Sequence, residues 1–513
     1  MADTFQQGWS YYSKAASAGV AANAGQQYCA NVQSAIDTFA EEMQSMVEQH
    51  GNLGVAQCKG FVAESWHANT FNINAALQES ENKAFVEQST DFGSVDVSTN
   101  FGRNYSMKYI VNAEDSADAQ AMNYYEKYYE YLKKPRKGEP MTFEEYLQKH
   151  GIENNPEELL KSVYNGQYRV IPKDQLVDAI KYLEMLKKIE EGKDGPNRAL
   201  VYENYAETLR KLTDRISDGE GIESIPLDKE SAEIIVQLCR DREFNPEDFG
   251  IDITKLVTTD YILQQALKAG YTAAVMSLVM EIAPKVCDAL IFLIKNGEVD
   301  SEKLKEIGFA AVKGPALGFV RGYVSCALTI ACNSGKLGKQ FMGVQGNVVA
   351  AITVLAMDTI KNAWLVATGK MTAREMEVKT EDAALVSIAA LVGGSIGTVL
   401  LPQLAVLGYM IGSLVGSVIG TLVAEGKNAF IMALCANTGI TLFGVVNQDY
   451  SLSKEMITSL GLSIVELEHF GLSRIELNHT QLSRNELYRN ELKHLEFFTL
   501  RRGVIGVRRI GYV

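Results

Sequence analysis

The spacing of apolar and polar residues predicts a chain that is mainly helical. Helical spacing runs through residues 29–50, and a strongly amphipathic helix is expected over 114–134. A strand-like run, "YRVIP", precedes another helix for which Asp174 is the expected N-cap. Asp228 or Lys229 is expected to open a further helix in a charged region.

Two short runs interrupt this pattern with the alternation typical of β-strands. They are "FGSVDVSTN" at 92–100 and "NYSMKYIV" at 104–111, and the turn-forming "NFGRN" lies between them. Alternation on both sides of such a turn predicts an antiparallel hairpin. With the helices before and after it, the hairpin predicts a small α/β domain.

Residues 383–424 carry no charged side chain, and Pro402 divides them into two apolar arms. Each arm is long enough to span a bilayer. Small residues that recur every four positions allow close helix packing in water or in lipid, and here they are Gly408, Gly412, Gly416 and Gly420.

Three interpretations of this hairpin remain open. It spans a membrane permanently, it is the buried centre of a helical bundle, or it is buried first and inserts later. Amphipathic neighbours such as "NVVAAITVLAMDTIKNAWLVA" favour the buried hairpin. The third arrangement resembles the pore-forming domains of colicins, in which a hydrophobic hairpin lies inside a soluble helical bundle.

The C-terminal tail repeats with a period of five. Leucine recurs at this interval from Leu462 to Leu492, and Phe497 continues the series. An α-helix or a flat strand would scatter these positions over several faces. The tail therefore resembles pentapeptide-repeat β-coils, and its few repeats are expected to need a neighbouring surface to cover their ends.

Composition narrows the function classes. Lys and Arg number 49 against 63 Asp and Glu, so the chain with its net charge of −14 repels nucleic acid unless a local basic patch or a metal ion intervenes. Seven cysteines without a CxxC pair argue against a disulfide framework and a zinc ribbon. We therefore expect an intracellular, cytoplasmic protein, with membrane association through 383–424 as the alternative.

Candidate chemistry lies in the α/β region. Glu64 falls on a helix, Asp96 in the first strand-like run, Lys108 in the second, and Gln120 on the helix that follows. This order resembles the core of the PD-(D/E)xK restriction-endonuclease-like nucleases. The resemblance implies Glu64, Asp96 and Lys108 as catalytic residues and Glu64 and Asp96 as Mg²⁺ ligands. Ser106 departs from the pattern, because the family has an acidic residue two positions before the lysine.

The resemblance has a clear chemical meaning. Carboxylates hold Mg²⁺, which bridges the scissile phosphate and lowers the pKa of a water, and a nearby lysine stabilises the developing negative charge. The alternative interpretation is a hairpin with an ordinary surface aspartate and lysine. His67, beside Trp66, is better explained as a structural histidine than as a catalytic base.

The C-terminal "RRGVIGVRRIGYV" contains four arginines and no acidic residue, and it is a candidate surface for nucleic acid or a protein partner. These arginines are Arg501, Arg502, Arg508 and Arg509. The alternating apolar residues equally suit an edge strand that closes the β-coil. As a whole, the chain resembles bacterial and mobile-element proteins with a glycine-rich helical region and a pentapeptide-repeat-like tail, a likeness that implies no particular activity.

The sequence thus predicts a multidomain, mainly α protein with a small α/β domain, a large helical bundle around a buried glycine-zipper hairpin, and a short β-coil. The expected parts are a helical arm (1–58), a nuclease-like α/β domain (59–195), a charged helical connector (196–260), a helical bundle (261–448) and a repeat tail (449–513).

Two function classes follow from these parts. The first is a nuclease-like domain, active or degenerate, that acts on or binds nucleic acid and is joined to a helical assembly module. The second is a membrane-active or pore-forming effector that inserts hairpin 383–424. DNA, a membrane, and self-association or another protein bound through the tail are the partners that these classes imply.

Overall fold

A computed structural model of the protein shows a mainly helical chain with a small mixed sheet of five strands. It divides into two compact units, residues 28–261 and residues 1–27 with 262–513. The residues that the structure describes are 2–89, 93–135, 138–195, 197–268, 283–288, 291, 317–367, 369–372, 374–376, 379, 464–465 and 511–512.

The sheet belongs to the unit formed by residues 28–261. Its strands are β1 (Ala84–Val86), β2 (Val97–Thr99), β3 (Tyr105–Met107), β4 (Tyr168–Val170) and β5 (Leu212–Thr213), in that spatial order. The pairs β1–β2 and β2–β3 are antiparallel, whereas β3–β4 and β4–β5 are parallel. The predicted hairpin is therefore confirmed as β2–β3.

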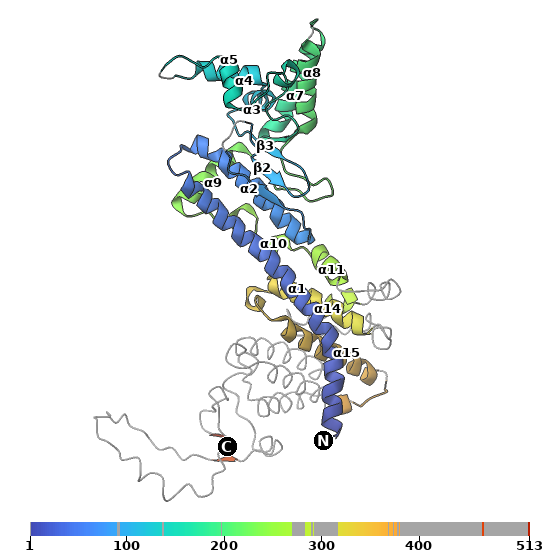
Figure 1. Ribbon diagram of the computed structural model, residues 1–513. Helices are drawn as coiled ribbons and strands as arrows, with labels where there is room; N and C mark the ends of the chain where they lie inside the picture. The colour runs from blue at the N-terminus through green and yellow to red at the C-terminus, as the bar shows by residue number, and fades with distance from the viewer. Residues whose placement is uncertain are drawn as a thin grey trace, which may run out of the picture. The chain divides into compact units, whose positions relative to one another are not determined.

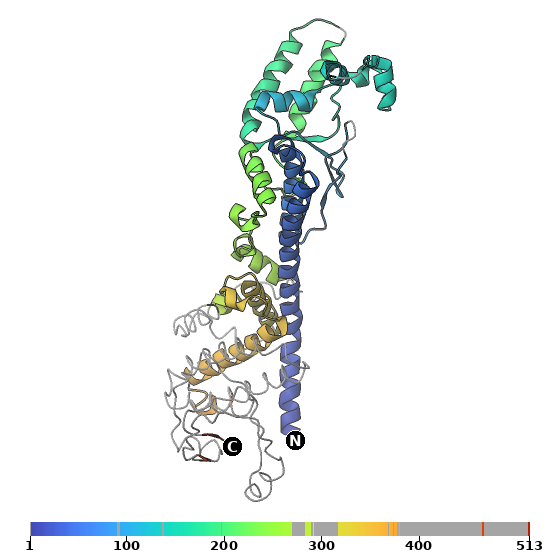
Figure 2. The same ribbon diagram turned by 90° about the vertical axis from the view of Figure 1, so that its left-hand side faces the viewer.

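Helices cover both faces of this sheet (Figures 1 and 2). On one side lie α2 (Val55–Gln78) and α9 (Lys229–Asp241), joined by an ion pair of 2.8 Å between Lys59 and Glu233. On the other side lie α3 (Ala113–Ala121), α7 (Leu176–Glu191) and α8 (Arg198–Lys211). A compact apolar core joins α3 and α7 to the end of β4, and its buried members are Ala117, Ala121, Ile171, Ala179 and Leu183.

The α/β region continues beyond residue 195. Strand β5 pairs with β4, and α8 packs beside α7, so residues from the predicted connector complete the sheet and its helical layer. Asp228 is the N-cap of α9 and accepts a hydrogen bond of 2.7 Å from the Ser231 backbone. Asp174 is not the N-cap of α7, because it lies within the 3₁₀ turn η1 (Lys173–Gln175) and accepts the Lys229 backbone N–H.

The single helix expected over 114–134 is two helices, α3 and α4 (Tyr124–Lys133). The first ends at Ala121 with Met122 as its C-cap, and Asn123 is the N-cap of the second. Its side chain accepts a hydrogen bond of 3.0 Å from the Glu126 backbone, and the Glu126 carboxylate accepts 2.9 Å from the Asn123 backbone. This reciprocal capping box stabilises a new helix start within the continuous amphipathic pattern.

Shorter elements complete this unit. Helices α5 (Phe143–Lys149) and α6 (Pro156–Leu159) lie between α4 and β4 in the chain. The 3₁₀ turn η2 (Pro246–Phe249) and helices α10 (Ile253–Leu256) and α11 (Thr259–Lys268) follow α9, and α11 continues past the end of the unit. A second core is aromatic, with edge-on ring contacts of Phe39 to Trp66 and Phe244, and of Trp66 to Phe249.

In the other unit, the first part of α1 (Ala2–Gln49) packs against α14 (Leu317–Asn333) and α15 (Gly346–Ala367). Gly25 is required for this approach, since a Cβ there would lie 2.9 Å from the Cys326 carbonyl oxygen. Arg321 and Asp358 join α14 to α15 through an ion pair of 3.0 Å. The short turn η4 (Lys339–Phe341) lies between these helices in the chain, and residues 283–288 are also helical.

Several sequence predictions concern residues outside the described ranges. These include hairpin 383–424, its four zipper glycines and most of the repeat tail. In the tail, β6 (Ile464–Val465) pairs antiparallel with β7 (Gly511–Tyr512). None of the described helices has both the length and the apolar character needed to cross a membrane.

Candidate functional site

The three residues predicted to form a site come from three adjacent elements of one unit. Glu64 lies in the first half of α2, Asp96 directly precedes β2, and Lys108 directly follows β3. Because β2 and β3 are antiparallel, the start of one lies beside the end of the other, and Asp96 thus neighbours Lys108. Helix α2 packs against β1 and β3 and contributes Glu64 from one face of the sheet.

An ion pair joins the two strand residues. The Lys108 ammonium lies 3.2 Å from Asp96 Oδ2 and also donates 2.9 Å to the carbonyl oxygen of Met107. The same Asp96 oxygen accepts a hydrogen bond of 2.6 Å from the Met107 backbone N–H. Both charged side chains are largely buried, with 21% of Lys108 and 13% of Asp96 exposed, so water screens the pair only weakly.

The pKa of Glu64 is shifted by burial and by the charges of this ion pair. Burial, and then the negative charge of Asp96, raise the pKa of Glu64 to about 8, while the Lys108 ammonium opposes the change. At neutral pH the Glu64 carboxyl is therefore protonated, and this neutral acid lies near the ion pair of Asp96 and Lys108. Two carboxyl groups that share a partly buried space disfavour each other's ionisation, which is characteristic of functional sites.

Ser106 occupies the position at which the resemblance would require an acidic residue. Its side chain is fully buried and its hydroxyl donates 2.8 Å to Gln120 Oε1 on α3. Gln120 in turn donates 3.1 Å to the carbonyl oxygens of both Ser106 and Val170. The pair thus fastens α3 to β3 and β4, and Ser106 adds no carboxylate to the site.

Tyr164, which sequence reasoning missed, forms one wall around Lys108. The Lys108 ammonium lies 4.5 Å from the centre of its ring, a cation–π contact. Burial alone would lower the pKa of Lys108, but Tyr164 and Asp96 outweigh burial and leave the pKa above its ordinary value. Lys108 is therefore a fixed positive charge.

The loop that carries Tyr164 is held rigidly. The Tyr164 backbone N–H donates 3.1 Å to the Ser162 hydroxyl, which donates 2.7 Å to the Gln120 carbonyl oxygen. Gly93 approaches the same loop so closely that a Cβ would lie 2.9 Å from the Val163 carbonyl oxygen. With a φ of +67°, Gly93 also has a backbone conformation that other residues adopt only with strain.

The donor set fits Mg²⁺ only if water or substrate completes its coordination. Across the described residues, no group of three or more His, Cys, Asp or Glu side chains is arranged to hold a metal ion. Mg²⁺ commonly binds one or two carboxylates and keeps several waters or phosphate oxygens. Glu64 and Asp96 can supply those carboxylates, and a cation would favour the ionised form of Glu64 that Asp96 now disfavours.

His67, one turn beyond Glu64 on α2, is a structural residue. It is fully buried, with Nδ1 2.8 Å from the Ser224 hydroxyl and Nε2 2.8 Å from the Tyr109 hydroxyl. Because Tyr109 donates its own proton to the Leu227 carbonyl oxygen, we assign the His67 proton to Nε2. Burial lowers the pKa of His67 to about 3, so the imidazole stays neutral.

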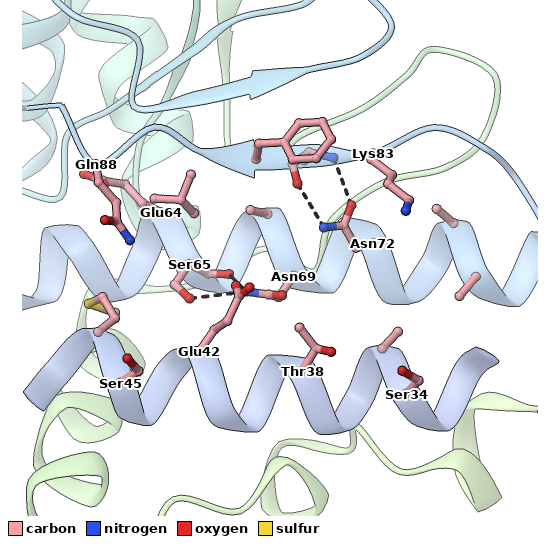
Figure 3. Close-up of a pocket in the computed structure, with 18 of the residues that line it drawn as sticks. Ser34, Thr38, Glu42, Ser45, Glu64, Ser65, Asn69, Asn72, Lys83 and Gln88 are labelled. Atoms are coloured by element: carbon pink, nitrogen blue, oxygen red, sulfur yellow. Dashed lines mark hydrogen bonds between the residues drawn. The ribbon is translucent and has the colours of Figure 1, made fainter. Parts of the chain in front are cut away.

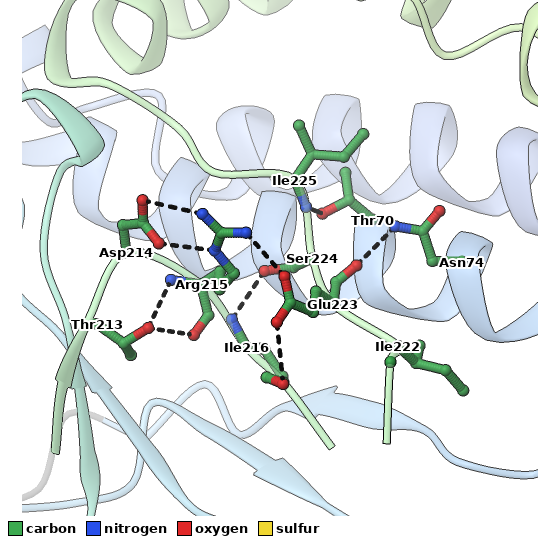
Figure 4. A network of polar contacts seen from close by, with 12 residues as sticks. Thr70, Asn74, Thr213, Asp214, Arg215, Ile216, Ile222, Glu223, Ser224 and Ile225 are labelled. Atoms are coloured by element: carbon green, nitrogen blue, oxygen red, sulfur yellow. Dashed lines mark hydrogen bonds and ion pairs between the residues drawn. The ribbon is translucent and has the colours of Figure 1, made fainter. Parts of the chain in front are cut away.

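A polar network anchors α2 to the segment after β5 (Figure 4). Arg215 forms ion pairs of 2.8 Å with Asp214 and 2.7 Å with Glu223. Asn74 on α2 donates 2.6 Å to the Glu223 carbonyl oxygen, and the Thr70 hydroxyl accepts 3.0 Å from the Ile225 backbone. These contacts fix the helix that carries Glu64 in its place against the sheet.

Comparisons with protein-family models, with curated proteins and with solved structures find no match for this chain. Its function must therefore be argued from the site itself. The other predicted site residues lie outside the described ranges. They are the arginines expected to bind nucleic acid or a partner, Arg501, Arg502, Arg508 and Arg509, and the glycines expected to pack helices or meet a membrane, Gly408, Gly412, Gly416 and Gly420.

Proposed function

We propose that the α/β region is a nuclease-like domain that binds nucleic acid and, with Mg²⁺, hydrolyses its phosphodiester bonds. The observation that carries the proposal is the grouping of Glu64 and Asp96 with the fixed positive charge of Lys108. The order of elements supports it: a helix, three antiparallel strands, a run of helices that begins with α3, and a strand parallel to the third.

Each residue has a definite role in this proposal. Mg²⁺, when bound, would polarise the phosphate and lower the pKa of the attacking water. Glu64 and Asp96 would hold the ion, and Lys108 would stabilise the charge that develops on the phosphate oxygens. Because the chain is strongly acidic, the cation and Lys108 together would also be needed to attract the phosphate.

Ser106 occupies the position at which the nuclease pattern has an acidic residue. The second form of the proposal is therefore a degenerate site, which binds nucleic acid without cleaving it. Mutagenesis separates the two forms. Full-length protein is incubated with single-stranded and duplex DNA and RNA in Mg²⁺ or in EDTA, and both binding and cleavage are measured. An active site gives Mg²⁺-dependent cleavage that Asp96→Ala abolishes, whereas a degenerate site gives Mg²⁺-dependent binding alone.

A matched control separates the effect of the site residues from the effect of the acidic surface as a whole. Glu81 is an exposed carboxylate in the same unit, and Glu81→Gln should leave binding and cleavage unchanged. If the wild-type protein neither binds nor cleaves any of the four nucleic acids, the proposal is wrong. The same conclusion follows if Asp96→Ala and Lys108→Met both retain full binding.

The membrane-active alternative rests on hairpin 383–424, which lies outside the described residues. It remains a proposal from the sequence. Fractionation of the expressed protein into soluble and detergent-extracted pools tests it directly, since a spanning hairpin would place the protein in the detergent pool.

A further inference from the structure

A long trough runs along α2 in the unit of residues 28–261, with the second part of α1 as one wall and β1 as the other (Figure 3). Its volume is about 900 Å³. The residues of α2 and its C-cap that line it extend from Phe61 to Glu79, which at 1.5 Å per residue makes it about 27 Å long. A space so long and narrow suits an extended chain better than a compact ligand or a helix.

The trough is lined mainly by small and neutral polar side chains. Ser34, Thr38 and Ser45 carry hydroxyls along α1, Asn69 lies on the side of α2 that faces them, and Asn72 points from α2 towards β1 (Figure 3). Alanines form much of the remaining floor. Such a surface offers closely spaced hydrogen-bond donors and acceptors without strong charge.

Aromatic faces lie at two places along the trough. Phe85 on β1 lines the trough and is 48% exposed, so its ring is accessible to a ligand. Near the other end, His50 and Phe61 stack with their ring centres 3.8 Å apart, one helical turn before Glu64. A flat apolar face beside neutral polar groups favours ligands with both C–H faces and hydroxyl groups.

The lining argues against two other kinds of extended chain. Three glutamates and one lysine line the trough, so cationic side chains are scarce and the lining offers little attraction for the phosphates of a nucleic acid. An extended peptide would be expected to pair with the free edge of β1. Asn72 blocks that edge, because its carboxamide already accepts from the Ala84 N–H and donates to the Ala84 carbonyl oxygen, both at 2.9 Å.

We propose that the trough between α1, α2 and β1 is a binding site for a linear neutral oligosaccharide. The sugar hydroxyls pair with the serine and threonine hydroxyls along α1, and the C–H face of a sugar ring stacks on Phe85. Glu64 is one of the residues that line the trough. The trough thus meets the proposed phosphodiester site at Glu64.

The test measures binding by full-length protein in EDTA, using cellohexaose, maltohexaose and chitohexaose in isothermal titration calorimetry. At least one of the three should bind. Thr38→Phe fills the trough from an exposed position and should weaken that binding by roughly tenfold or more, about the effect of losing one well-made contact. Phe85→Ala should weaken it by about 2- to 10-fold, and Phe85→Trp should retain it.

A control and two competing probes make the outcome decisive. Glu41 is exposed on α1 and does not line the trough, so Glu41→Phe should bind as the wild type does. The proposal is wrong if none of the saccharides binds at millimolar concentration, or if Thr38→Phe leaves their affinity unchanged. It is also wrong if oligothymidylate or a lysine-rich octapeptide binds in place of the saccharides and Thr38→Phe weakens that binding.

This inference does not depend on the proposed nuclease. Saccharide binding is measured without Mg²⁺, and Asp96→Ala, which should abolish the phosphodiester chemistry, should leave it intact because Asp96 does not line the trough. Failure of one proposal is therefore visible without failure of the other.

Discussion

Replacing Glu64 by glutamine should stabilise the protein at neutral pH. The pKa of Glu64 is about 8 in the folded protein against its ordinary value of 4.5, so between these values the folded state binds more protons than the unfolded chain. The free energy of unfolding therefore falls as the pH rises through this window. Glutamine mimics the protonated acid, so the free energy of unfolding of the variant should not fall through this window.

The size of the effect follows from the shift in pKa. One pH unit corresponds to about 1.4 kcal/mol, which gives an upper limit of about 3 kcal/mol at pH 7. Solvent screening of this partly exposed group reduces the figure. A carboxyl group that lowers the stability of the free protein is consistent with a functional site, because the residues of such sites commonly reduce stability in favour of activity.

Hydrogen exchange of peptides from α2 is the suitable assay, because the protein has two units and global unfolding need not be a single transition. Protection of α2 in the wild type should decrease from pH 5 to pH 8, after correction for intrinsic exchange, and Glu64→Gln should remove most of the decrease. Glu81→Gln serves as the control. If Glu64→Gln shows the wild-type pH dependence, Glu64 titrates normally and the electrostatic account of the site is refuted.

Three further predictions concern buried groups. The pKa of His67 is lowered to about 3, so the unfolding free energy should fall as the pH drops from 6.5 towards 3, and chemical denaturation of His67→Gln should show a shallower acid limb. Tyr164→Leu should lower the pKa of Lys108, measured by NMR of the labelled side chain, because Tyr164 opposes the lowering that burial causes; an unchanged pKa would contradict that role. Glu207→Leu should destabilise by about 3–5 kcal/mol in urea unfolding, since it leaves the fully buried Arg169 without its ion-pair partner, and adding Arg169→Met should recover much of the loss.

Local features of the fold were predictable from neighbouring residues. Alternation and the "NFGRN" turn predicted the β2–β3 hairpin, and the antiparallel pairing then set Asp96 beside Lys108. Asp228 was recognisable as a cap because its partner, Ser231, is three residues away. Asn123 has the same kind of signal, with Glu126 three residues on, and this capping box could have located the break between α3 and α4.

The properties of the site were decided by contacts between distant parts of the chain. Glu64 joins Asp96 and Lys108 because α2 packs on the sheet and is anchored there by residues beyond 210, which no local pattern shows. The raised pKa of Glu64 and the neutrality of His67 arise from burial created by this packing, and the Tyr164 ring reaches Lys108 from the separate loop before β4. Spacing and caps act over a few residues and can be read along the chain, whereas desolvation and charge coupling depend on which segments meet in space. The sequence by itself therefore determined which residue types were present in which elements, and the tertiary structure determined their protonation, their partners and the trough that leads to them.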